Sequence, residues 1–409
     1  MLKKFGKRLF DPSLNTVRLS LHIDGMPLFH SSDYNLWPIL ANVGKKPVFI
    51  VGLYGGKKKP RCSNQYLKPL VDEICALKKN GLKIEDKLYR LVLHNIMMDA
   101  PARSYILGVK GHTAKKCCPR CKVVGVRSVR EGFSSTSGQR RLCRRKALCF
   151  LNLDAPKRDS SDFISAENAP DCDEGAGCES KQCWSEYMSP ADSSGYVTET
   201  DYSNSEDEDE HIRVYAPEPA PKPKRSAKSQ KASYFKHRTI LTKIPGFNPL
   251  TDIPMDYMHL VCLGIMKKLL TIWTKNEACL SENNKAAVEE SLSQVRDYFP
   301  AEFQRKPDLV EALKRWKATQ FRSFLLYHGY SALQGRLCDK YLQNFSYLVA
   351  SMRLLTKTER GNEESRSVIA EFARKLIRKF IESGIVLYGP EFAVSNVHML
   401  IHVPDDYVR

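Results

Sequence analysis

The sequence predicts an α/β fold, in which a mixed sheet with flanking helices is followed by a largely α-helical region. Two observations carry this prediction. Apolar runs with the spacing of strands surround one amphipathic helix in the first hundred residues, and apolar residues recur at helical spacing from about residue 234 onward. The chain has 409 residues, of which 42% are hydrophobic, so it can form a substantial core.

Three strands and one helix are predicted before residue 81. Residues 17–23 alternate apolar and polar side chains, which is the period of a half-buried strand. Two further apolar stretches, residues 36–43 and 48–53, are separated by a Gly- and Pro-containing turn and complete a meander. Residues 63–80 then carry apolar side chains at helical spacing, with Ser63 at the predicted N-cap.

A fourth strand is predicted over residues 89–98 and ends at Asp99, just as the first strand ends at Asp24. This order of three strands, a helix and a strand, with carboxylates on the first and fourth strands, is the ribonuclease H arrangement. Neighbouring strands would bring Asp24 and Asp99 together, and such hard oxygen ligands suit Mg²⁺ or Mn²⁺. Spacing alone also allows turn or capping aspartates.

The rest of the chain divides by composition. Ser, Pro, Asp and Glu accumulate over residues 127–233, which we predict to be a low-complexity, disordered insertion. Residues 1–126 would then form the first half of the sheet domain, 234–385 a helical insertion domain, and 386–409 the start of the sheet domain's C-terminal part. Helices are predicted near residues 258–273, 286–298, 308–327, 340–355 and 365–382.

Charge points to a polyanionic partner. The formal net charge is +18, and because the acidic run from Glu199 to Glu210 holds seven carboxylates and no base, the remainder carries +25. A polyanion is the expected partner, with a solvated basic surface as the alternative. Three basic runs, at residues 57–61, 140–146 and 222–231, are candidate phosphate contacts, and the last also predicts nuclear import. No membrane segment or signal peptide is predicted.

A zinc site is predicted from two residue pairs. Cys118 and Cys121 have the CxxC spacing of a zinc knuckle, and His398 and His402 are spaced so that both imidazoles can lie on one helical face. Together they would form a structural Cys₂His₂ site. The alternatives are reduced core thiols, core or surface histidines, and other cysteine ligands: Cys117, Cys172, Cys178 and Cys183.

A second acid and histidine pair begins the helical half. Asp256 and His259 are three residues apart just after Pro254, so they could present a carboxylate and an imidazole to a phosphate on one helical turn. A structural histidine with a local partner is the alternative interpretation.

These motifs together resemble the transposases of CACTA-type DNA elements, in the version common in animal genomes. Leu21 to Gly25 looks like the family's first catalytic aspartate motif, and Asp99 to Arg103 like the second. Gly111 to Thr113, followed by the cysteine pair, looks like its CxxC element, and Asp256 to His259 like its DxxH element. The resemblance covers about residues 17–126 and 234–408.

The resemblance implies a ribonuclease H-like DDE/D nuclease that cleaves DNA at element ends and joins the 3′ hydroxyl to target DNA. Two Mg²⁺ or Mn²⁺ ions would be held by Asp24, Asp99 and a glutamate, with His259 near the scissile phosphate and Asp256 orienting it. The related V(D)J recombinase closes a similar zinc site, which supports zinc ligation by the two cysteines and two histidines. A homo-oligomer in the nucleus is also expected.

One departure from the family concerns the glutamate, which in the family follows the histidine pair. No such motif precedes Arg409, so we expect the third metal ligand to be missing and catalysis to be impaired. Glu289, Glu290 and Glu311 are available carboxylates but lie in the predicted helical insertion. The alternative is a domesticated, non-catalytic DNA-binding or interaction protein that retains the transposase fold.

Overall fold

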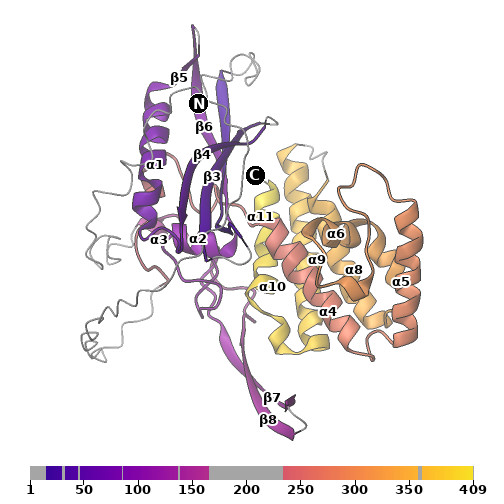
Figure 1. Cartoon of the computed structure of the whole chain (residues 1–409). Coiled ribbons are helices and arrows are strands. Elements are labelled where there is room, and N and C mark those ends of the chain that lie inside the picture. The colour runs from indigo at the N-terminus through magenta and orange to yellow at the C-terminus, as the bar shows by residue number, and fades with distance from the viewer. Residues whose placement is uncertain are drawn as a thin grey trace, which may run out of the picture. The chain divides into compact units, whose positions relative to one another are not determined.

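A six-stranded mixed sheet occupies the first part of the chain in the computed structural model (Figure 1). Strand β1 pairs antiparallel with β3 and parallel with β6, while β2 and β4 pair with β3 and β5 pairs with β6. The strands are β1 (Thr16–Ile23), β2 (Met26–Pro27), β3 (Asn35–Val43), β4 (Phe49–Gly56), β5 (Leu82–Ile84) and β6 (Lys87–Met97). The structure describes residues 15–29, 33–44, 47–84, 86–136, 139–164, 234–357 and 362–408.

Helix α1 (Ser63–Asn80) provides the crossover that the parallel β1–β6 pair requires. Its apolar face, including Leu67 and Ile74, packs in one core with the alternating inward side chains of β1. The helix bounds match the prediction. The predicted N-cap is wrong by one residue, because Cys62 takes the extended N-cap conformation and Ser63 is the first, fully buried helical residue.

A hairpin lies where no regular structure was predicted. Strands β7 (Val126–Thr136) and β8 (Gln139–Cys149) pair antiparallel, and α3 (Ser161–Ile164) follows. The prediction of disorder from residue 127 is therefore wrong as far as residue 164, because backbone pairing needs no apolar periodicity. Residues 165–233 lie outside the described part, and with them the acidic run, the third basic run and the cysteines 172, 178 and 183.

The second half of the chain is helical, as predicted. The segment expected as one helix over residues 308–327 is instead divided into a 3₁₀ turn, a short α-helix and a π-helix. The main elements are η3 (Met258–Met266, a π-helix), α4 (Lys267–Lys275), α5 (Glu282–Asp297), η4 (Val310–Ala312), α6 (Ala318–Ser323), η5 (Phe324–His328), α7 (Gly329–Leu333), α8 (Asp339–Leu355), α9 (Glu363–Tyr388), α10 (Ser395–Met399), η7 (Leu400–His402) and α11 (Val403–Val408).

Two hydrophobic clusters divide the described core. One contains the sheet, α1 and α2 (Ala100–Ile106), and it also takes Leu241, Ile244 and Ile253 from the segment predicted to begin the helical domain. The other contains the helices from Met255 onward. The core therefore changes near residue 254 rather than at residue 234, although both clusters belong to one compact unit of the chain.

Aromatic contacts join the two chain segments that flank residues 165–233. The ring centroid of Phe163 lies 6.5 Å from that of Tyr234 and 5.2 Å from that of Phe235. The Lys110 amide also donates to the Tyr234 carbonyl at 3.0 Å. Residues 164 and 234 are thus anchored at one place on the sheet cluster.

Within the described ranges, no helix combines the length and apolar character needed to cross a bilayer.

Candidate functional site

The register of the parallel β1–β6 pair places the two predicted aspartates side by side. His22 is the partner of Met97, and Asp24 and Asp99 each follow two residues later on their chains. Because the two strands are parallel, both aspartates lie at the same end of the sheet, and because neighbouring strands are about 4.8 Å apart, they lie close together. The prediction that neighbouring strands bring Asp24 and Asp99 together is met by this register.

Both carboxylates are held by backbone amides. Asp99 is the N-cap of α2, and its Oδ1 accepts a hydrogen bond from the Ala102 amide at 2.6 Å. Asp24 Oδ1 accepts from the amide of Gly25 at 2.7 Å. Each carboxylate keeps its second oxygen outside these bonds, so the capping role considered from spacing is compatible with ligand binding.

Electrostatics at the sheet end favour a cation. Burial raises the pKa of Asp24, and the negative charge of Asp99 raises it further, against the lowering influence of the Gly25 amide and His259. Two like charges in a half-buried place are an unfavourable arrangement that a bound cation would relieve. The donor chemistry of the pair therefore fits Mg²⁺ or Mn²⁺.

Gly25 is needed directly after the first aspartate. A Cβ atom at this position would lie 2.6 Å from Cε2 of Trp37, whose ring is buried and packs against Tyr105. Trp37 belongs to β3 and its indole packs against Tyr105 of α2, so the ring cannot move away freely. The Asp24-Gly25 sequence is thus fixed by packing.

Asp256 and His259 form a hydrogen-bonded pair at the start of η3. Asp256 Oδ2 lies 2.5 Å from His259 Nδ1, and Oδ1 accepts from the amides of Met258 and His259 at 2.9 and 3.2 Å. Burial lowers the pKa of His259, but the bond to Asp256 and the charges of Asp256, Asp99 and Asp24 raise it overall. Nε2 is left to face a ligand, and the imidazole is biased toward its protonated form.

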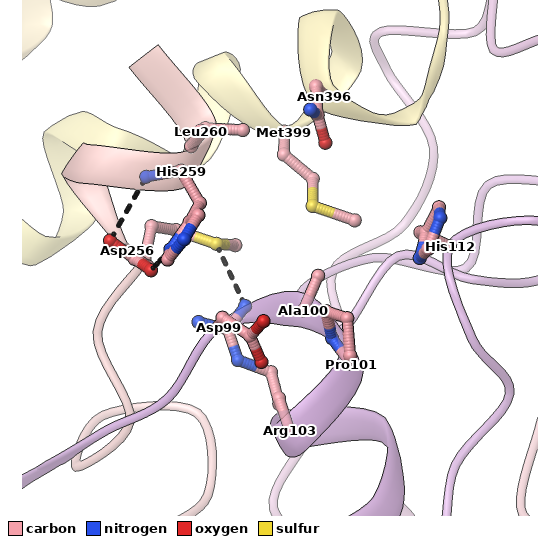
Figure 2. A pocket seen from close by; sticks show the side chains of 11 residues that line it. Asp99, Ala100, Pro101, Arg103, His112, Asp256, His259, Leu260, Asn396 and Met399 are labelled. Carbon is pink, nitrogen blue, oxygen red and sulfur yellow. Dashed lines mark hydrogen bonds and ion pairs between the residues drawn. The ribbon is translucent and has the colours of Figure 1, made fainter. Parts of the chain in front are cut away.

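A cavity of about 240 Å³ separates this pair from Asp99. Figure 2 shows Asp99 entering from the start of α2 and His259 from η3, with His112 on a further wall. The described residues that line the cavity include Asn396 and Met399 but not Asp24. Asp99, Asp256 and His259 thus line one open cavity, and the charges of both aspartates raise the pKa of His259.

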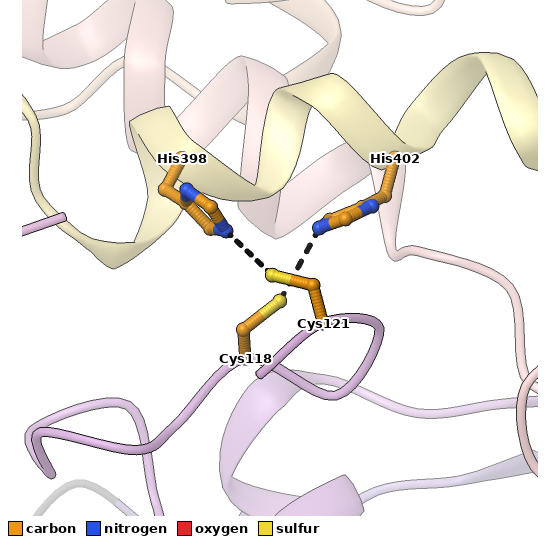
Figure 3. A group of neighbouring side chains, drawn as sticks. All are labelled: Cys118, Cys121, His398 and His402. Atoms are coloured by element: carbon orange, nitrogen blue, oxygen red, sulfur yellow. Dashed lines mark hydrogen bonds between the residues drawn. The ribbon is translucent and has the colours of Figure 1, made fainter. Parts of the chain in front are cut away.

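The four predicted zinc ligands converge. The donor atoms of Cys118, Cys121, His398 and His402 all lie within 4.8 Å of one another, and all four side chains are buried (Figure 3). Tetrahedral zinc with bonds of about 2.0 to 2.3 Å would need donors roughly 3.3 to 3.8 Å apart. The Cys118 Sγ to His402 Nε2 distance is 3.4 Å, and the Cys121 Sγ to His398 Nε2 distance is 3.2 Å.

The charge state of the cysteine pair suits a metal. Burial alone would raise the pKa of Cys118, but hydrogen bonds with Cys121, His398 and His402 lower it overall. The bond to Cys118, followed by burial, raises the pKa of Cys121. One thiolate is therefore already favoured, and a buried set of two sulfur and two imidazole donors is one that can bind a metal such as zinc.

The other candidates lie elsewhere. Cys117 is buried beside the site but outside the four-donor set. Glu289 Oε1 accepts from the Glu311 amide at 3.1 Å, and both residues line a different cavity, next to α4 and α5. Of the basic runs, residues 57–61 and residues 140–146, which belong to β8, lie in the described ranges, and Lys59 Nζ lies 4.6 Å from the ring centroid of Tyr105 on α2.

Sequence reasoning missed a buried charge network around the site. Arg103 and Arg120 are 6% exposed, and they donate to backbone carbonyls of the segment that leads to Asp256. Asp406 pairs with Arg120. Both arginines lie inside recognised motifs, but their partners are more than 120 residues away, so local spacing carries no signal for them.

No protein-family model matches the sequence, and neither the curated proteins nor the solved structures contain a match.

Proposed function

We propose that this chain contains the catalytic core of a metal-dependent DNA transposase of the CACTA type, built on a ribonuclease H-like sheet. The single observation that supports this most is the parallel register that aligns Asp24 with Asp99. The strand order β4-β3-β1-β6, with α1 as crossover, agrees with the arrangement expected for that fold.

In this proposal the chain's own residues divide the work. Asp24 and Asp99 would hold divalent cations through carboxylate oxygens that the amides of Gly25 and Ala102 leave available. When bound, such cations activate an attacking oxygen and stabilise the leaving oxygen of a phosphodiester. His259 would present Nε2 to the scissile phosphate, while Asp256 fixes the ring through Nδ1 and raises the pKa of the imidazole.

The charge distribution supports DNA as the substrate. The chain has a net charge of +18, and the exposed basic run of residues 57–61 lies beside α2, whose N-terminus carries Asp99. The Tyr105 hydroxyl donates to the Pro60 carbonyl at 2.6 Å and holds this run against the helix. Lysines of this run, which lies against Tyr105 near the C-terminal end of α2, would supply phosphate contacts.

A nicking assay tests the proposal. The full chain would be incubated with supercoiled plasmid and Mn²⁺ or Mg²⁺, and conversion to open circles measured. We expect slow cation-dependent nicking, because the third carboxylate ligand is expected to be missing, and a further fall of at least about 100-fold in Asp24→Asn and in Asp99→Asn, because both carboxylates would act directly on the ion. Asp72→Asn, on the exposed face of α1, is the matched control and should leave the rate unchanged.

Two results would contradict catalysis at this site. Nicking that persists in both variants would place the activity elsewhere or in a contaminant. DNA retention in a mobility-shift assay without any nicking would instead favour the non-catalytic DNA-binding protein.

A further inference from the structure

A buried ion pair links the two halves of the Cys₂His₂ site. Arg120 lies between Cys118 and Cys121, and its Nη2 donates to Asp406 Oδ1 at 2.5 Å. Asp406 follows His402 by four residues and is 14% exposed in its side chain. A buried ion pair is favourable only when its remaining donors and acceptors are also satisfied.

Three further hydrogen bonds of the pair go to one short segment, residues 250–255. Arg120 donates to the carbonyls of Leu250 and, at 3.0 Å, Ile253. Asp406 Oδ2 accepts from the Met255 amide at 2.7 Å. Arg120 and Asp406 therefore both hydrogen-bond to the backbone that immediately precedes Asp256.

Arg103 binds the same segment and also the end of β6 that leads to Asp99. Its guanidinium donates to the Pro254 carbonyl at 2.8 Å and to the Met98 carbonyl at 3.4 Å, next to Asp99. The segment is thus held between the end of β6 and the metal site. A displacement of the two ligand pairs would be transmitted through Arg120 and Asp406 to Asp256.

We infer that Arg120 and Asp406 are positioning residues that couple metal binding at the Cys₂His₂ site to the placement of Asp256 and His259. A metal fixes Cys118 and Cys121 relative to His398 and His402, and so fixes Arg120 relative to Asp406. Without it, two thiol–imidazole contacts join the ligand pairs directly. The consequence for catalysis rests on the function proposed above, whereas the coupling itself does not.

Hydrogen–deuterium exchange of the full, zinc-loaded chain tests the coupling. We expect chelation of zinc to speed amide exchange of residues 250–260 at least tenfold more than exchange within α8. The reason is that the Met255 amide donates to Asp406, and the Met258 and His259 amides donate to Asp256. Arg120→Gln should produce the same local change with zinc still bound, as measured by metal content.

Arg158→Gln is the matched control. Arg158 also touches the knuckle, since its Nε donates to the Cys118 carbonyl at 3.0 Å, but its guanidinium stacks on Tyr234. It should leave exchange at residues 250–260 unchanged. An equal rise throughout the chain after chelation, or no rise at residues 250–260 in zinc-loaded Arg120→Gln, would overturn the coupling. If exchange responds but no DNA is nicked in any state, the coupling stands and the proposed catalysis fails.

Discussion

The Cys₂His₂ site and the carboxylate site differ in how completely the fold has assembled them. Among the described residues, the four sulfur and imidazole donors already converge within 4.8 Å and are fully enclosed. Asp24, Asp99 and His259 are each partly exposed and surround or adjoin an open cavity. A structural metal site needs all its ligands at once, whereas a site for a substrate must leave room for it.

The same contrast appears in the electrostatics. At the closed Cys₂His₂ site, hydrogen bonds lower the pKa of Cys118 while the pKa of Cys121 is raised, so one thiolate is favoured there. The open site does the opposite, because burial and Asp99 raise the pKa of Asp24. Ionisation is therefore favoured at Cys118 and opposed at Asp24. Groups that serve function are often less favourable for stability than groups that serve the fold.

The largest effect is expected at the closed site. Cys118→Ser should abolish stoichiometric zinc binding and lower the melting temperature by more than about 10 °C, because structural zinc contributes several kcal/mol to folding. Metal analysis and differential scanning calorimetry measure this. Cys117→Ser, at the adjacent buried thiol outside the donor set, should keep zinc. Full zinc content in Cys118→Ser would refute the ligand set.

Gly25→Ala should be the next largest change. The new Cβ would meet Trp37 Cε2 at 2.6 Å, so unfolding free energy should fall by about 1 to 3 kcal/mol through overpacking. Denaturant unfolding measures the loss. Gly111→Ala, whose Cβ would have its nearest neighbour at 3.6 Å, serves as the control, and equal stability of the two variants would show that Trp37 can move.

Asp24→Asn should stabilise the protein, in contrast to the two substitutions above. Without added Mg²⁺ or Mn²⁺, it should raise the melting temperature at pH 7 by roughly 1 to 3 °C, since it removes one of two repelling carboxylates. The folded pKa of Asp24 lies above its ordinary value, so its ionised form opposes folding above that pKa. The gain should shrink as the pH falls toward 4. A loss of stability at pH 7 would contradict this account of the open site.

The smallest effect is a change in titration. Asp256→Asn removes the carboxylate bonded to Nδ1, so the pKa of His259 should fall toward or below that of an ordinary histidine. NMR titration of the imidazole in the absence of added divalent ions measures it. His22→Ala, at a neighbouring position on β1, should leave that titration nearly unchanged. An unaltered His259 pKa in Asp256→Asn would remove Asp256 as its orienting partner.

The elements around both sites were predictable where the signal is local. The alternation of residues 17–23 and the helical spacing of residues 63–80 reflect which side chains the core buries, and the structure confirms both elements. Asp24 and Asp99 could be paired because parallel strands end at one edge. The cysteine and histidine pairs could be joined because zinc chemistry calls for four such donors.

The remaining features depend on contacts that sequence spacing does not encode. The β7–β8 hairpin is held by backbone pairing, for which polar side chains carry no periodic signal. The Arg120–Asp406 pair spans 286 positions and was invisible for that reason. The expected helix at 308–327 is divided into three short elements, which its apolar spacing did not indicate. The catalytic roles themselves stay predictions.

The junction of Phe163 with Tyr234 and Phe235 has a consequence for how this gene can change. Phe163 lies against Tyr234 and Phe235, so the two ends of the intervening segment are held close together, and the entropy of closing a chain between two such ends grows only logarithmically with its length. Residues added between positions 164 and 234 should therefore lower the free energy of unfolding only slightly. The same junction offers a place where a reporter domain can be inserted while the two chain ends that meet there stay in contact.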